Sequence, residues 1–148
     1  MRALPDEVVL SETPPDPAEH EAMMLAAGVT PKASAPDGFR GVAALWARDR
    51  DLLVGQGVIL ELRRRAEARP ELAPPGWPHP VGAVELLAVI PEYRDGGLEE
   101  RLLHGLARLF RIRVPCRDAL IWVGEAHVPM RLGTLDALGP GARDRWLR

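Results

Sequence analysis

The sequence predicts a single α/β domain in which a mixed central sheet is flanked by helices on both faces. The second half alternates strand, helix and strand between residues 81 and 124, which favours a parallel pair joined by a right-handed crossover. Two apolar β segments follow one another in the first half, which favours an antiparallel hairpin. A chain of 148 residues that is 47% hydrophobic has the size and composition of one globular domain.

The N-terminal segment is predicted to be a short strand followed by a helix. Residues 8–10 are apolar and precede a proline-rich turn. Asp16 has the side chain of an N-cap, Pro17 suits the first helical position, and Glu19 stands where a capping box places its acid. We expect this helix to end at Gly28, because glycine accepts the left-handed backbone of a helix C-terminus.

The central segment reads as a loop and then a hairpin. Residues 30–41 have no periodicity and are expected to form the loop. Residues 42–47 and 52–60 are rich in Val, Leu and Ile and are separated by a short polar turn. Gly55 and Gly57 interrupt the second strand, where glycine marks a bulge or a close backbone approach.

Residues 61–80 are predicted to be an insert between strands. The segment opens with consecutive arginines and carries five prolines, which cannot continue a sheet. Two interpretations stay open: a surface excursion with a solvated run of charge, or a lid or partner surface.

The second half carries the clearest elements. Residues 81–90 are apolar except for Glu85, and such a strand is typically buried on both faces. Residues 98–111 repeat leucines at helical spacing. A further strand is expected at 119–124 and a last helix over 128–139, where glycine and proline stop it.

Composition excludes several kinds of site. One cysteine allows no internal disulfide, and the four histidines are scattered without ligand spacing, so no metal site is predicted. Ser11 and Ser34 are the only serines, and neither lies in a nucleophile elbow, which excludes serine hydrolysis.

Charge and hydropathy exclude several partners. The net charge of −2 and the few aromatic residues beside the arginine run argue against nucleic acid as a partner. No apolar run is long enough for a membrane helix, and residues 1–7 lack the shape of a signal peptide. We therefore expect a cytoplasmic protein with no membrane partner.

A resemblance emerges at the end of the apolar strand. Residues 89–103 read VIPEYRDGGLEERLL. This segment resembles the signature of GNAT N-acetyltransferases, in which a strand ending V-x-P-E-Y leads into [Q/R]-x-x-G-x-[G/A] and a leucine-rich helix. Arg94 and Gly97 match the first two fixed positions, whereas Glu99 occupies the last, where the family has Gly or Ala.

Other segments resemble the same family in order, over roughly residues 6–140. Residues 53–57, LVGQG, look like its third strand, and residues 132–139 look like its last helix. The resemblance implies a GNAT-like acyl-CoA N-acyltransferase fold with a shortened C-terminus, since few residues follow Gly139. The acceptor pocket would then be open or completed by a second subunit, which makes a homodimer an expectation.

The resemblance also implies where an acyl donor would bind. A glycine-lined turn that opens a helix presents free N–H groups at the positive end of the helix dipole, which suits a pyrophosphate. Acetyl-CoA is the implied co-substrate. The backbone of the preceding strand would hold its pantetheine arm, and the loop its phosphates. The implied binding residues are Leu87, Val89, Arg94, Asp95, Gly96, Gly97, Leu98 and Glu99.

Glu85 is the candidate catalytic base. The family often uses a carboxylate on this strand to deprotonate the amine acceptor, and Glu85 matches that location. The alternative is a structural glutamate at an exposed edge or paired with an arginine of the insert. Tyr93 is the only tyrosine, so the last helix offers no tyrosine to protonate the leaving thiolate.

Two functions follow from the resemblance. The first is an acyl-CoA-dependent N-acetyltransferase that acts on an amine of a small molecule or a protein. The alternative is a catalytically degenerate GNAT-like domain that serves binding, regulation or assembly. Asp95, Glu99 and Glu100 favour the alternative, because carboxylates beside the turn would repel phosphate by about 4 kcal/mol per pair at ~4 Å and an effective dielectric near 20.

Overall fold

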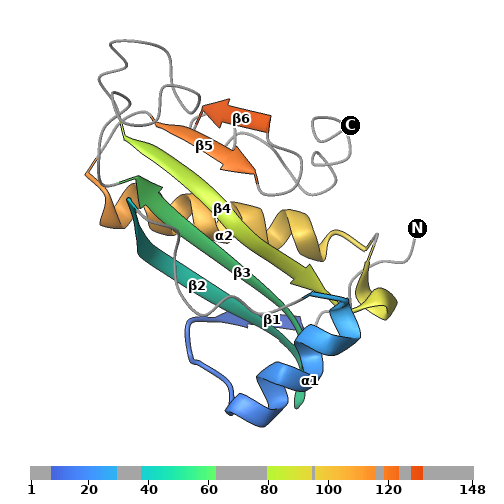
Figure 1. The fold of residues 1–148 in the computed structure, drawn as a ribbon. Coiled ribbons are helices and arrows are strands. Elements are labelled where there is room, and N and C mark those ends of the chain that lie inside the picture. Colours follow the sequence, from blue (N-terminus) through green and yellow to red (C-terminus); the bar gives the residue numbers. More distant parts are fainter. Residues whose placement is uncertain are drawn as a thin grey trace.

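A computed structural model describes residues 8–29, 38–62, 80–94, 96–115, 119–123 and 128–131, the last segment by its backbone. Six strands form one sheet in the order β1-β2-β3-β4-β5-β6 (Figure 1). The strands are β1 (Val8–Ser11), β2 (Phe39–Asp49), β3 (Leu52–Leu62), β4 (Val81–Val89), β5 (Leu120–Val123) and β6 (Val128–Arg131). The helical elements are α1 (Pro17–Ala27), the 3-10 turn η2 (Pro91–Tyr93) and α2 (Leu98–Arg113).

The sheet is mixed, as the sequence predicts. Every neighbouring pair is antiparallel except β4 and β5, which are parallel and are connected through α2. An antiparallel first half joined to a parallel pair by a crossover helix is the predicted GNAT-like α/β arrangement. The fold class is therefore confirmed.

The two helices cover opposite faces of the sheet. A side chain at Gly55 or Gly57 would meet Leu102 or Leu106 of α2 at 3.6 and 2.8 Å. Gln56 lies between these glycines, points to the other face and contacts His20 of α1 at 2.6 Å. The two glycines thus mark a close approach of α2 to β3, one of the two outcomes that the sequence left open.

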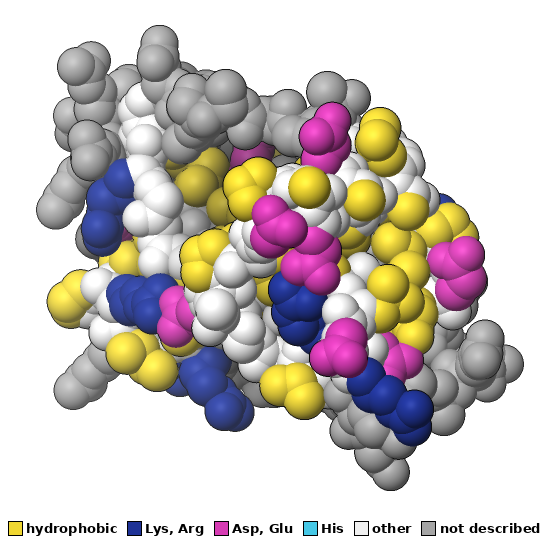
Figure 2. Space-filling view, turned by 90° about the horizontal axis from the view of Figure 1, so that it is seen from below, with side chains coloured by type: hydrophobic (Ala, Val, Ile, Leu, Met, Phe, Trp, Pro, Cys, Tyr) yellow, Lys and Arg dark blue, Asp and Glu magenta, His cyan; other side chains and the backbone are white. Residues whose placement is uncertain are grey.

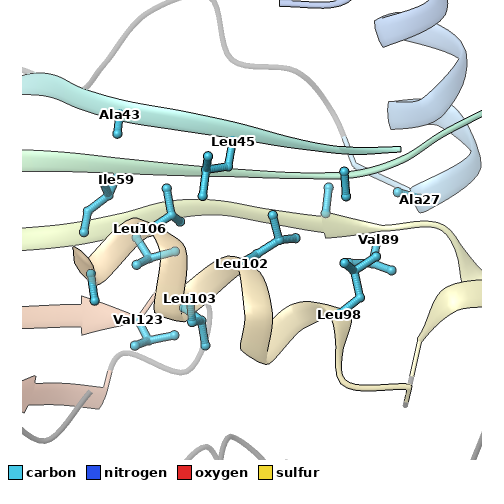
Figure 3. Packing of buried hydrophobic residues seen from close by; sticks show 14 of the residues in the cluster. Ala27, Ala43, Leu45, Ile59, Val89, Leu98, Leu102, Leu103, Leu106 and Val123 are labelled. Carbon is cyan, nitrogen blue, oxygen red and sulfur yellow. The ribbon is translucent and has the colours of Figure 1, made fainter. Parts of the chain in front are cut away.

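The core lies mainly between α2 and the sheet (Figure 3). Leu98, Leu102, Leu106 and Phe110 recur every four residues along α2, and all are 0% exposed. Leu103 of α2 and Val123 of β5 both belong to this buried cluster and are labelled in Figure 3. This apolar stripe fixes the rotation of α2 about its axis and therefore which of its side chains face the sheet.

The N-terminal helix differs from the prediction in its cap. α1 begins at Pro17 and ends at Gly28, whose φ of 73° is left-handed, both as expected. However, Asp16 makes no side-chain cap, and no capping box forms. Glu19 instead pairs with Arg48 of β2 through two hydrogen bonds of 2.6 and 2.9 Å. A long-range ion pair therefore replaces the predicted local contact.

Two predicted boundaries and one predicted element are also wrong. β2 begins at Phe39, inside the expected loop, and β3 extends through Leu62, inside the expected insert. The last helix was expected from residue 128, but Val128–Arg131 forms the strand β6, antiparallel to β5. The rest of the expected helix and most of the insert lie outside the described residues.

Candidate functional site

Among the described strands, β4 extends beyond its parallel pairing with β5. Strands β4 and β5 are paired from Val81 with Leu120 to Val84 with Val123. Farther along, residues 85–89 pair with β3 but with no other described strand. Because a strand rises about 3.3 Å per residue, the open edge of β4 is roughly 13 Å long.

The backbone of β4 presents hydrogen-bonding groups along this open edge. The N–H of Ile90 donates to the carbonyl of Val54 in β3 at 3.0 Å. Since backbone groups alternate between the two sides of a strand, those of Leu87 and Val89 point away from β3, toward the open edge. Their side chains lie on the α2 side of the sheet. A Cβ added to Gly57 would come within 3.6 Å of the Leu87 side chain, and one added to Gly55 would come as close to that of Val89.

Glu85 lies at an irregularity of β4. Val58 pairs with Leu86 and the next residue, Ile59, pairs with Val84, so Glu85 is the extra residue of a β-bulge. Its side chain is half-buried and follows Val84, which is buried in the core. The bulge thus places a carboxylate where the open edge of β4 begins.

The N-terminus of α2 follows β4 after η2 and a short loop. Gly97 is the N-cap residue, with a left-handed φ of 92°, and no side chain caps the helix there. A Cβ added to Gly97 would meet nothing within 4 Å. Glycine is therefore required here by the backbone conformation rather than by crowding, and the space before the first turn is open on that side.

Arg94 has protein partners. Its Nε donates to the carbonyl of Val89 at 2.9 Å, and its Nη2 donates to the carbonyl of Ala27, in the last turn of α1, at 2.8 Å. Its backbone N–H donates to the carbonyl of Pro91 at 3.2 Å. Arg94 thus joins the end of β4, the end of α1 and the loop before α2, while any contact with a phosphate stays a prediction.

A second side chain holds the same loop. The hydroxyl of Tyr93 donates a hydrogen bond to Oδ2 of Asp49, the last residue of β2. Tyr93 also packs against the core and is half-buried. Sequence reasoning missed this contact, because 44 residues separate the two partners and nothing local indicates it.

Carboxylates accompany the first turn of α2. Glu99 is half-buried, whereas Glu100 is only 8% exposed. The more deeply buried acid is therefore Glu100 and not Glu99, the residue at the last fixed position of the motif. A signal for it exists in the sequence: Glu100 shares a helical stripe with Leu103 and Ala107, both buried. Asp95 lies outside the described residues.

The other charged groups do not gather into a second site. The described residues hold no group of three potential metal ligands, and no described helix could span a membrane. Figure 2 shows acidic and basic side chains interleaved with hydrophobic ones on the face that it presents. The described part of that face therefore offers no broad basic surface for nucleic acid.

The described residues of the predicted site lie along β4 and at the start of α2. Leu87 and Val89 lie on the open edge of β4, and Gly96, Gly97, Leu98 and Glu99 form the turn and the start of α2 that follow it. Glu85 lies at the other end of the edge. The fold and this geometry define an α/β protein in which β4 extends past its described partner β5 and is followed by a helix that begins after Gly97.

Comparisons with known proteins add little to this description. No protein-family model matches the chain, and no curated protein sequence matches it. A similar solved structure is a chain of the NatC complex, crystallised with Gag peptide and CoA. It is 14% identical, has a TM-score of 0.49, and the match covers 78% of this chain and 73% of that chain. At this level the likeness carries no argument about function.

Proposed function

We propose that this chain is an acyl-CoA-dependent N-acetyltransferase that transfers an acetyl group to an amine of a small molecule or a protein. The observation that carries the proposal is the edge of β4 beyond its described pairing with β5, which is followed, after η2 and a short loop, by the start of α2 at Gly97. An extended chain with amide groups can add to a strand edge, and an anion fits the helix N-terminus that follows.

Acetyl-CoA suits this arrangement chemically. The backbone groups of Leu87 and the N–H of Val89 would hold the amides of the pantetheine arm, while the carbonyl of Val89 accepts a hydrogen bond from Arg94. The backbone of Gly96, Gly97 and Leu98 would hold the pyrophosphate, because glycine leaves room for close approach. Bound acetyl-CoA would supply an acetyl group activated as a thioester.

Glu85 would act as the general base. From its position at the bulge, the carboxylate would face the α1 side of the sheet, away from the core that α2 covers. There it would accept the proton that the amine loses as nitrogen replaces sulfur on the acetyl carbon. The α1 face would then be the side from which the acceptor arrives, and its polar pair His20 and Gln56 lies on that face.

One observation favours the degenerate domain as a second candidate function. Glu100 is 8% exposed in the first turn of α2, with Glu99 beside it. Carboxylates stabilise a helix N-terminus by about 0.3–1 kcal/mol each, so they can occupy the positive end of the dipole themselves. A domain of this kind would bind partners without binding acetyl-CoA.

Calorimetric titration with acetyl-CoA separates the two candidates. We expect micromolar binding by the unmodified protein, followed by acetylation of an amine in an acceptor screen that Glu85→Gln abolishes. Binding only after Glu99→Gly or Glu100→Gln would support the degenerate domain. Glu92→Gln is the matched control, because this exposed carboxylate lies in η2 and outside the first turn of α2. No binding by any of these proteins would refute the acetyltransferase and the placement of the acyl-donor site.

A further inference from the structure

The loop between β4 and α2 is held by side chains of its own. It has two long-range anchors among the described contacts: Arg94 on the carbonyl of Ala27, and Tyr93 on the carboxylate of Asp49. The first anchor fastens the loop to α1, and the second fastens it to the turn between β2 and β3. Both anchors immediately precede Gly96 and Gly97.

We propose that Tyr93 and Asp49 are a positioning pair for the acyl donor, an inference that rests on the proposed function. An anion is bound at a helix N-terminus only when several backbone N–H groups point at it together. Tyr93 contributes no group to that set. Its hydrogen bond to Asp49 fixes the backbone four residues before Gly97 and so fixes the direction of the first turn.

The neighbouring contacts show why this bond is suited to positioning. Asp49 ends β2, and its backbone pairs with both Leu52 of β3 and Val8 of β1, so the acceptor is itself held by the sheet. Tyr93 is half-buried and packs against the core. A donor packed against the core and an acceptor held by the sheet would transmit the position of the sheet to the loop.

The test compares acetyl-CoA affinity in variants that remove or keep this bond. Tyr93→Phe and Asp49→Ala each remove it, and we expect each to weaken binding about tenfold, which corresponds to ~1.4 kcal/mol. The double variant should be no weaker than either single one, because both delete the same contact. Asp49→Asn keeps an acceptor oxygen and should retain most of the affinity.

Glu19→Gln is the matched structural control. It breaks the ion pair with Arg48, the residue next to Asp49, which ties α1 to β2 without touching the loop. We expect it to lower the melting temperature and leave affinity unchanged. Losses of affinity in Glu19→Gln equal to those in Tyr93→Phe would overturn the positioning role, as would unchanged affinity in Tyr93→Phe and Asp49→Ala. Absence of binding by the unmodified protein would instead refute the proposed function, and this inference with it.

Discussion

A methyl group added to Gly82 should strain the region in which β4 and β5 are paired. Gly82 pairs with Ile121 across β4 and β5, and α2 covers it with Phe110. A Cβ at this position would lie 2.7 Å from Cε2 of Phe110 and 2.8 Å from Cδ1 of Ile121. Both neighbours are 0% exposed, so neither can turn away into solvent.

The cost can be estimated from those contacts. An extra carbon in a well-packed core typically destabilises by 1–3 kcal/mol. We expect Gly82→Ala to lose about 2 kcal/mol, or roughly 4–8 °C in melting temperature for a chain of this size. Urea denaturation followed by circular dichroism would measure the loss.

Two further variants make this estimate specific. Gly41→Ala is the matched control, since its Cβ would meet nothing within 4 Å and its φ is not left-handed, so stability should stay equal or rise by less than about 1 kcal/mol. Phe110→Leu should partly relieve Gly82→Ala, so that the double variant loses less than the two single losses combined. A Gly82→Ala protein within about 0.5 kcal/mol of the unmodified one would refute the packing argument.

Three other outcomes are expected. The hydrogen bonds from Arg48 hold the pKa of Glu19 below its usual range, so this carboxylate stabilises the fold above its unfolded pKa of about 4.3 and stops doing so as pH falls. Urea midpoints should therefore drop more steeply in the unmodified protein than in Glu19→Gln below about pH 5; parallel curves would contradict this. Arg94→Ala should lose about 1–2 kcal/mol by leaving two carbonyls without their donor, and Arg94→Lys should lose less, as urea midpoints would report. Leu106→Ala should lose 2–5 kcal/mol from the core, whereas Leu25→Ala, at a 72% exposed position, should stay within about 0.5 in the same titration.

The sequence predicted those elements whose apolar spacing and terminal residues lie within a single segment. The strand at 81–90 and the helix from Leu98 were evident because apolar spacing and the glycine before the helix are read within one element. The segment at 128–131 was misjudged because four residues show no period, and Pro129 argues against a strand unless the strand is at an edge, where β6 lies.

The site was predictable in its backbone and not in its side chains. The signature placed Gly97 at the helix start because glycine spacing is local. It could not indicate that the guanidinium of Arg94 meets Ala27, or that Glu19 pairs with Arg48 rather than capping its own helix. These contacts depend on how α1 lies against the sheet, which no single segment encodes.

The long-range contacts of α2 and of the loop before it also bear on the order in which the chain folds. Arg94 and Ala27 are separated by 67 positions, and Arg101 reaches the carbonyl of Val8 across 93. Contacts of such long sequence separation carry a high loop-closure cost and form after local structure. We therefore expect the turn before α2 to become ordered late, when the N-terminal strand and helix dock. Hydrogen exchange during refolding would show its amides protected after those of β3 and β4.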